Sequence, residues 1–307
     1  MDPPAQLAPA PASAPPEGGI DVSVVLPVYN ERGHLRAEVE RIRAALDASP
    51  YRYEIIVVDD GSDDGSEHEI ALLDDIALIR FPTNRGSGSA RRAGTAAARG
   101  DVVVWTDADM TYPNERIPEL VKELDGWDQV VGARTSEQGT LKALRVPAKW
   151  LVRKLASYLA ETRIPDLNSG LRAFRRRVAA PYLHLLPPGF SCVTTLTMAF
   201  LANGHSVKYV SIDYAPRAGK SKFHWWTDTK RYLIQVVRMV LTYNPLKAFL
   251  PVALTLFAAG LVKFGFDVVT KDFRLATNTL LLLFAAFQVL AIGLLADLVV
   301  RVTKPRD

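Results

Sequence analysis

The chain has 307 residues and a single cysteine, Cys192, so it cannot form an internal disulfide. A lone cysteine fits a reducing compartment, and we expect a small buried side chain there rather than a nucleophile. The N-terminal segment is rich in proline and alanine and has neither an apolar run nor a basic start, so it does not resemble a signal peptide. We expect residues 1–20 to be disordered.

Other absences limit the partners that the chain can have. The formal net charge is only +4, which does not argue for nucleic acid, and the five histidines show no metal-ligand spacing. Basic residues do gather between 145 and 177 and between 220 and 238, just before an apolar C-terminal third. Basic residues beside membrane segments suit an anionic lipid surface on the cytoplasmic side.

Segments typical of strands and of helices alternate from residue 21 onward. Helical spacing is clearest at Leu35, Val39, Ile42 and Leu46. The strands are predicted at the apolar, β-branched runs 22–27, 54–58, 77–81, 101–106, 129–132 and 207–214. Such alternation predicts an α/β domain with a mostly parallel, Rossmann-like sheet that is covered on both faces, over residues 21–222.

Two long apolar stretches end the chain, at about 248–269 and 280–300, within a segment 246–307. Each reaches the ~20 residues that cross the hydrocarbon core of a bilayer, so they predict a transmembrane hairpin. The basic residues at its two ends place both ends in the cytoplasm, although Lys271 and Arg274 in the connecting loop reduce this asymmetry. The alternative is a buried helical pair in a soluble protein. Lys263 and Asp297 lie near helix ends or pair inside a homo-oligomer.

Residues 223–245 form an amphipathic pattern immediately before the hairpin. A polar stripe at 3,4 spacing faces an apolar side that carries aromatic residues. A helix of this kind either packs on the domain or lies in the membrane interface. Trp225, Trp226 and the neighbouring basic residues favour an interfacial helix.

Two acidic turns, each after a very apolar strand, carry the strongest functional signal. In an open α/β sheet, ligands bind outside the carboxyl ends of the strands. Asp107 and Asp109 stand one residue apart and so point the same way, which suits a divalent ion that also holds phosphate oxygens. In the first turn Asp60, or as second choice Asp59, can accept a hydrogen bond from a base N–H; the alternative is capping within the turn.

Two further segments fit a nucleotide. Pro27, Val28 and Tyr29 end the first strand, where backbone groups and a Tyr ring can hold a base. Gly86 lies in a glycine-rich loop before a helix start, which favours a phosphate, although ordinary turn chemistry explains the same residues.

In order and spacing, these motifs resemble family-2 glycosyltransferases of GT-A fold. The resemblance rests on VLPVYNE at 25–31, VVDDGS at 57–62 and TDAD at 106–109, and it runs from about Val22 to Lys222. Within that family, DLNSGLRAF at 166–174 and RAGKSK at 217–222 look like polyprenyl-phosphate sugar synthases, including dolichol-phosphate mannose synthases.

The resemblance implies roles for individual residues. It implies that Asp60 reads the base and that Asp109 contacts Mg²⁺ or Mn²⁺, with Asp107 helping through the metal or the sugar. Thr111 departs from those synthases, which have Gln at this place as a third ligand. The nucleotide-binding set is Pro27, Val28, Tyr29, Glu31, Asp59, Asp60, Gly86 and Asp107.

A lipid phosphate acceptor requires cations, and arginine holds phosphate with a fork of donors. The residues assigned to this phosphate are Arg134, Arg145, Ser169, Arg217, Lys220 and Lys222. Asp166 joins Asp107 and Asp109 as a catalytic candidate, as a positioning residue first and a base second, because a phosphate monoester is already anionic near neutral pH. Residues 190–195 lack the acidic pair that sugar-accepting relatives use as a base.

The sequence therefore predicts an inverting, metal-dependent glycosyltransferase at the inner membrane, with its catalytic domain and both termini in the cytoplasm. It would move one sugar from a GDP- or UDP-linked donor to polyprenyl phosphate. The alternatives are a glycosyltransferase of the same fold that acts on a glycan or diacylglycerol, and a non-catalytic, membrane-anchored nucleotide-binding protein. Sugar, nucleotide and isoprenoid length stay open.

Overall fold

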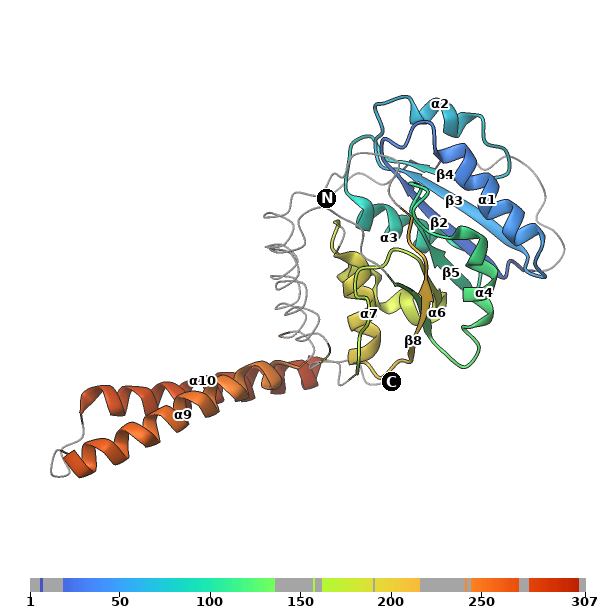
Figure 1. Ribbon diagram of the computed structural model, residues 1–307. Helices are drawn as coiled ribbons and strands as arrows, with labels where there is room; N and C mark the ends of the chain where they lie inside the picture. The colour runs from blue at the N-terminus through green and yellow to red at the C-terminus, as the bar shows by residue number, and fades with distance from the viewer. Residues whose placement is uncertain are drawn as a thin grey trace. The chain divides into compact units, whose positions relative to one another are not determined.

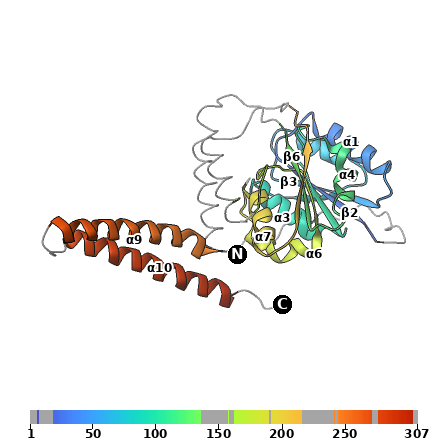
Figure 2. The same cartoon turned by 60° about the horizontal axis from the view of Figure 1, so that its bottom comes forward.

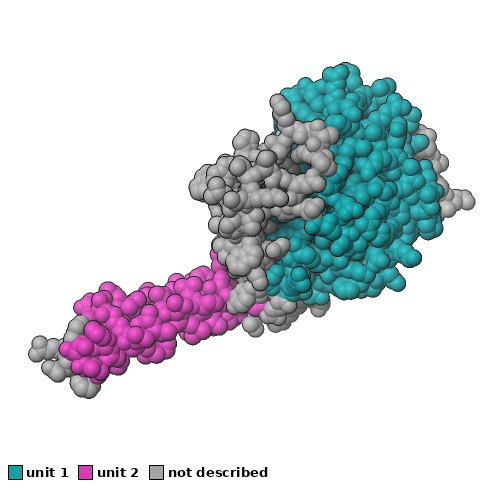
Figure 3. Space-filling model, viewed as in Figure 1, with its two compact units in different colours: residues 1–230 teal, residues 231–307 magenta. Residues whose placement is uncertain are grey.

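The computed structural model describes residues 6–7, 19–135, 157, 162–189, 191–215, 241, 244–270 and 276–303. The chain divides into two compact units, residues 1–230 and 231–307, which are coloured separately in Figure 3. The predicted interfacial helix over 223–245 lies almost entirely outside the described residues.

A single mostly parallel sheet forms the first unit, with the strand order β1-β4-β3-β2-β5-β7-β6-β8. Strands β2 to β5 run parallel, β8 runs parallel to β6, and β7 is antiparallel to both β5 and β6. The strands are β2 (Val22–Val28), β3 (Tyr53–Asp59), β4 (Ala77–Arg80), β5 (Val102–Trp105), β6 (Gln129–Arg134), β7 (Arg172–Arg175) and β8 (Val207–Ile212). The predicted α/β class is confirmed, and the sheet is mixed because β7 and the short β1 (Gln6–Leu7) run against their neighbours.

Helices cover both faces of this sheet, on its two sides in Figure 2. One face carries α1 (Leu35–Asp47), α2 (Ser66–Ala71) and α4 (Ile117–Lys122). The other carries α3 (Ser87–Ala97), α6 (Arg176–Ala179), the 3-10 helix η2 (Ala180–Leu185) and α7 (Cys192–Ala202). Cys192 is fully buried, as expected for a small core residue.

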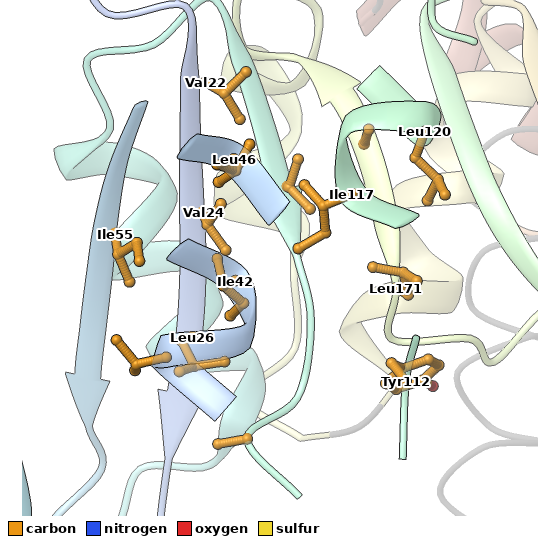
Figure 4. Close-up of a cluster of buried hydrophobic side chains, with 14 of the residues drawn as sticks. Val22, Val24, Leu26, Ile42, Leu46, Ile55, Tyr112, Ile117, Leu120 and Leu171 are labelled. Carbon is orange, nitrogen blue, oxygen red and sulfur yellow. The ribbon is translucent and has the colours of Figure 1, made fainter. Parts of the chain in front are cut away.

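The apolar spacing of α1 explains its place on the sheet. Leu35, Val39, Ile42 and Leu46 are all fully buried, and Figure 4 shows Ile42 and Leu46 against the β2 side chains. At ~25 cal/mol for each Å² of apolar surface, burial of such a stripe is the main stabilising term for a helix of this length.

One short strand lies inside the segment that we expected to be disordered. Strand β1 (Gln6–Leu7) pairs antiparallel with β4, so that Gln6 lies opposite Arg80 and Leu7 opposite Ile79. The other residues before 19 lie outside the described part of the chain.

The second unit holds two long apolar helices, α9 (Pro245–Thr270) and α10 (Thr277–Thr303). Both are long and apolar enough to cross a membrane, and they cover the two predicted spans. In their most apolar 18-residue windows only 11% and 17% of residues are buried. Helices with such exposed apolar faces need lipid or another protein around them, unlike the core helices of a soluble domain.

Small residues line the contact between these two helices. In α9 the buried positions Ala253, Gly260 and Asp267 recur every seven residues. In α10 the matching buried positions are Thr279, Ala286 and Gly293. A Cβ at Gly260 would lie 2.6 Å from Leu283 Cδ2, and one at Gly293 would lie 2.6 Å from Phe249 Cβ. Small residues let the two backbones approach closely, which is how helices pack within membranes.

The start of α10 is capped from the other helix. Asp267 of α9 is fully buried, and its Oδ2 accepts hydrogen bonds from Ala276 N at 3.0 Å and Thr279 Oγ1 at 2.5 Å. Lys263 lies one helical turn away, with Nζ 3.8 Å from Asp267 Oδ1. A side chain nine residues earlier in the chain thus satisfies an N–H at this helix start.

Candidate active site

The two acidic turns meet at one edge of the sheet. Strands β3, β2 and β5 are neighbours in the sheet and run in the same direction (Figure 1), so the loops after Asp59, Val28 and Trp105 leave from the same edge. This is the edge where ligands bind in open α/β sheets.

Both carboxylate oxygens of Asp59 are bonded to other groups of the protein. Its Oδ1 accepts a hydrogen bond from Ser62 N at 2.9 Å, and its Oδ2 forms an ion pair with Arg80 Nε at 3.1 Å. The side chain is almost completely buried. These contacts match the capping alternative for this turn.

Asp60 binds the glycine-rich loop. Its two carboxylate oxygens accept hydrogen bonds from Arg85 N at 2.7 Å and Gly86 N at 2.8 Å, and its own N–H donates to Val28 O at 2.8 Å. Burial raises the pKa of Asp60, and the two N–H donors oppose that rise only in part. Asp60 therefore joins the loops that follow β2, β3 and β4.

The glycine-rich loop packs against another loop. Gly88 N donates to Pro188 O at 2.7 Å, and a Cβ at Gly86 or Gly88 would lie 2.4 or 2.1 Å from a proline carbonyl oxygen, that of Pro188 or Pro187 respectively. Glycine is required here because two chain segments touch. The N–H of Gly86 donates to Asp60, and the phosphate role predicted for Gly86 stays a prediction.

The segment after β2 is bonded to the segment after β3. Asn30 exchanges two hydrogen bonds with Asp63, at 2.7 and 2.9 Å, and Glu31 N donates to Ser66 Oγ at 3.0 Å. Asn30 has a left-handed backbone with φ of 56°. Val28 is buried, while Pro27, Tyr29 and Glu31 are half-buried beside it. The predicted base-binding residues therefore lie together on a cross-linked pair of loops.

In the second turn, Asp107 pairs with a buried arginine. Arg91 of α3 reaches Asp107 Oδ1 with Nη2, lies over the ring of Trp105 at 5.7 Å, and places Nη1 4.0 Å from the Cys192 sulfur. Arg91 is only 2% exposed, whereas the side chain of Asp107 is 31% exposed. Asp107 is thus the most open of the four carboxylates in the two turns.

Asp109 is positioned by its own turn. Its Oδ1 accepts hydrogen bonds from Thr111 Oγ1 at 2.5 Å and from Thr111 N at 3.2 Å. Thr111 stands where the resembled synthases have Gln, and here its hydroxyl orients Asp109 instead of presenting an amide oxygen. Met110 between them has a left-handed φ of 60°.

The donor set of this turn fits a hard divalent ion. Among the residues that the structure describes, no group of three or more His, Cys, Asp or Glu side chains is placed to hold a metal. Mg²⁺ commonly takes only one or two carboxylates and completes its shell with substrate phosphates and water, which suits Asp107 and Asp109.

Arg134 and Asp166, predicted separately for the acceptor, form one buried pair. Arg134 Nε and Nη2 donate to the two oxygens of Asp166 at 2.7 and 3.0 Å, and Arg134 N adds a bond at 3.2 Å. Burial would raise the pKa of Asp166, but the hydrogen bonds and charge of Arg134 outweigh it and hold that pKa below its ordinary value. Arg134 also lies over the ring of Tyr214 at 5.2 Å.

Gly170 brings the two halves of the site together. Its N–H donates to Tyr112 Oη at 2.6 Å, and a Cβ at this position would lie 2.7 Å from Asp107 Oδ2. The neighbouring Ser169 is fully buried, and its Oγ has no hydrogen-bond partner among the described residues. Arg145, Arg217, Lys220 and Lys222 lie outside the described residues, so their predicted contacts with the acceptor stay predictions.

Two buried arginines contact the candidate site, and sequence reasoning missed both contacts. Besides Arg91, Arg172 of β7 donates to Val193 O at 2.5 Å, to Thr197 Oγ1 at 2.8 Å and to Ser169 O, joining α7 to the Ser169 turn. Burial lowers the pKa of Arg172 to about 10, so it remains charged at pH 7. A charged residue inside an apolar strand or an alanine-rich helix was the available signal.

Comparison with models of protein families shows which family the chain belongs to. The Glycosyl transferase family 2 model matches residues 23–183, and a model described as the GtrB C-terminal hairpin matches residues 244–302. The chain is a family-2 glycosyltransferase by sequence. It is 35% identical over 212 residues to an undecaprenyl-phosphate 4-deoxy-4-formamido-L-arabinose transferase of Aeromonas hydrophila subsp. hydrophila, with 66% of this chain and 62% of the relative aligned.

Solved structures confirm the GT-A fold for this family-2 chain. Glucosyl-3-phosphoglycerate synthase of Mycobacterium tuberculosis, in complex with phosphoglyceric acid, superimposes with a TM-score of 0.59 at 22% identity, over 72% of this chain and 80% of the other. The same enzyme with Mn²⁺, UDP and glucosyl-3-phosphoglycerate gives a TM-score of 0.58, at 22% identity and the same coverage. At this identity the likeness concerns the fold.

Proposed function

We propose that this family-2 glycosyltransferase moves one sugar from a nucleotide diphosphate sugar to polyprenyl phosphate. The observation that carries the proposal is the occurrence, in one chain, of the Asp107–Asp109 turn, the buried Arg134–Asp166 pair and a hairpin long enough to span a bilayer. A soluble acceptor would not require a membrane hairpin. The A. hydrophila relative, named as an undecaprenyl-phosphate transferase, supports the same acceptor.

On the donor side, Asp109 and Asp107 would hold Mg²⁺ or Mn²⁺, an ion that offsets the charge of the leaving diphosphate. The M. tuberculosis neighbours that contain Mn²⁺ and UDP support divalent metal use on this fold. The part of this sheet edge that we propose for the base is lined by Pro27, Val28, Tyr29 and Asp60. Each oxygen of Asp60 has one further lone pair with which it can accept a base N–H.

On the acceptor side, Arg134 binds the lipid phosphate and Asp166 positions Arg134. Two of the five guanidinium N–H groups of Arg134 point to Asp166, which leaves three for phosphate oxygens. An oxygen of the lipid phosphate attacks the anomeric carbon while the bond from that carbon to the nucleotide diphosphate breaks, with inversion. The phosphate is already ionised, so no carboxylate is needed to remove a proton.

The hairpin places this reaction at a membrane. We propose that both of its ends, and with them the catalytic unit, lie on the cytoplasmic side of the cell membrane, because basic residues flank both helices. The exposed apolar faces of α9 and α10 leave room for lipid or for a second hairpin in a homo-oligomer.

Purified full-length protein in detergent tests the proposal. It is incubated with Mn²⁺ or Mg²⁺, polyprenyl phosphate and a panel of UDP- and GDP-linked sugars, and the lipid fraction is analysed by mass spectrometry. A polyprenyl-phosphate-linked sugar that requires both metal and acceptor is the expected product. Transfer only to diacylglycerol or to a glycan, or nucleotide binding without transfer to any acceptor, would contradict the proposal.

A further inference from the structure

Helix α1 holds the chain immediately after the Asp107–Asp109 turn. Arg41 of α1 donates through Nη2 to Tyr112 O at 3.3 Å and to Glu115 Oε2 at 2.6 Å. Its Nη1 lies 3.7 Å from the Met110 sulfur. One side chain on a rigid helix therefore contacts three successive points of the loop that follows Asp109.

The same helix also holds the residue just before the turn. Glu38, one turn before Arg41 and paired with it at 3.1 Å, accepts a hydrogen bond from Asn114 Nδ2. Asn114 Oδ1 in turn accepts one from Thr106 Oγ1 at 2.6 Å. Glu38, Asn114 and Thr106 are all fully buried. The acidic turn is thus fastened at both of its ends to α1.

The turn itself requires such support. Met110 has φ of 60°, a left-handed conformation that a side chain with a Cβ rarely adopts and that costs free energy. A strained residue of this kind persists only where its surroundings determine its conformation. Arg41 contacts both Met110 and Tyr112, so it can hold the left-handed conformation of Met110 in place.

We propose that Arg41 is a positioning residue for the metal-binding turn, and that it sets the geometry in which Asp109 and Asp107 meet a divalent ion. This inference rests on the proposed metal role of the two aspartates. Neither Arg41 nor Glu38 touches substrate in it; they act through Met110, Tyr112, Asn114 and Thr106.

Binding of Mn²⁺ measures this directly. Free Mn²⁺ is followed by electron paramagnetic resonance in a titration of full-length protein, with Mn²⁺ alone and with UDP or GDP added. In Arg41→Lys the ammonium still pairs with Glu38 but cannot span Tyr112 O and Glu115. The Kd for Mn²⁺ should rise about 10-fold, as for other residues that orient metal ligands, while the thermal midpoint stays near that of the wild type.

Arg36→Ala is the matched control, because Arg36 lies on the same helix and pairs at 3.0 Å with Glu40 on the exposed face. It should leave the Kd for Mn²⁺ unchanged. Arg41→Ala should weaken binding at least as much as Arg41→Lys, but it also removes the partner of a buried carboxylate, so the lysine variant decides the test.

A second substitution separates positioning from general destabilisation. Glycine adopts left-handed φ without the cost that Met110 bears, so Met110→Gly in the Arg41→Lys background should recover much of the lost Mn²⁺ affinity. A Kd for Arg41→Lys equal to that of Arg36→Ala would overturn the proposal, as would a wild type that does not bind Mn²⁺. A wild type that binds Mn²⁺ and nucleotide but transfers no sugar contradicts the proposed function alone, since this test compares binding.

Discussion

The two acidic turns look alike in sequence and differ in what their carboxylates bind. At the end of β3, Asp59 and Asp60 are 1% and 2% exposed, and their oxygens accept hydrogen bonds from the protein's own N–H groups. At the end of β5, the Asp107 side chain is 31% exposed, and Asp109 is oriented by the residue two positions later. The first turn joins three loops, whereas the second leaves the carboxylate of Asp107 partly exposed at the edge of the sheet.

The comparison teaches that position after a parallel strand does not by itself make a ligand site. What separates the turns is the origin of their donors, because Asp60 binds backbone N–H groups of a different loop whereas Asp109 binds Thr111 of its own turn. The loop 84–88 donates two N–H groups to Asp60, whereas the chain after Asp109 is bonded to Arg41 of α1. Substitution of Asp59 should therefore affect folding, and substitution of Asp107 or Asp109 should affect chemistry.

The largest effect is expected at Asp109. Asp109→Asn keeps an oxygen that can accept from Thr111 but removes the charge that faces the metal, so turnover should fall about 1000-fold, or ~4 kcal/mol in activation free energy. Sugar transfer at saturating Mn²⁺ measures it, with circular dichroism to verify folding. Unchanged turnover would show that Asp109, like Asp59, has no role in the chemistry.

A third carboxylate, Asp166, extends the comparison, because it is buried and also paired with a charged side chain. Asp166→Ala leaves Arg134 without its counter-charge, and unfolding in urea should show a loss of ~3 kcal/mol. The control is Arg36→Ala, which breaks the exposed Arg36–Glu40 pair and should cost less than ~1 kcal/mol. Equal losses in the two variants would show that the Arg134–Asp166 pair contributes no more than a surface contact.

At the first turn a smaller loss of stability is expected, without a change in metal use. Asp59→Asn retains the bond from Ser62 N but loses the ion pair with the half-exposed Arg80, so the free energy of unfolding should fall by ~1 kcal/mol. The KM for Mn²⁺ in sugar transfer should match the wild type. A raised KM at this variant would mean that the first turn also serves the metal.

The smallest effect is the pH dependence of the Arg134–Asp166 pair. The pKa of Asp166 is lowered in the folded protein, so the stabilisation is present above the unfolded pKa of about 3.9 and is lost as pH falls through the folded value. The difference in thermal midpoint between wild type and Asp166→Asn should be constant from about pH 5 to 8 and shrink below about pH 4. A difference that instead grows in acid would reverse the sign assigned to this carboxylate.

Much of the fold was predictable because its signals are local. The β-branched runs became β2, β3 and β5, and the 3,4 spacing of Leu35 to Leu46 became the buried face of α1. The reversed direction of β7 was not predictable, because its four residues carry no mark of orientation.

The site was predictable in its residues but not in their partners. Asp107 and Asp109 were identifiable because they follow a strand. Their partners were not, because Arg91, which pairs with Asp107, lies 16 residues earlier in the chain, and Arg41, which holds the chain after Asp109, lies on α1. Gly86 shows the limit most clearly. A glycine that allows a phosphate to approach and a glycine that allows another loop to approach look the same in sequence, and the close approach of Pro188 to Gly86 is visible only in the structure.

Asp267 has a consequence for how the chain enters a bilayer. At the start of α10, the N–H of Ala276 and the hydroxyl of Thr279 bond to a carboxylate that α9 supplies, so a helix α10 inserted alone would lack this cap. The cap forms only when both helices are present side by side. Insertion should therefore be concerted, with the translocation machinery receiving the hairpin as a single unit and not one span after the other.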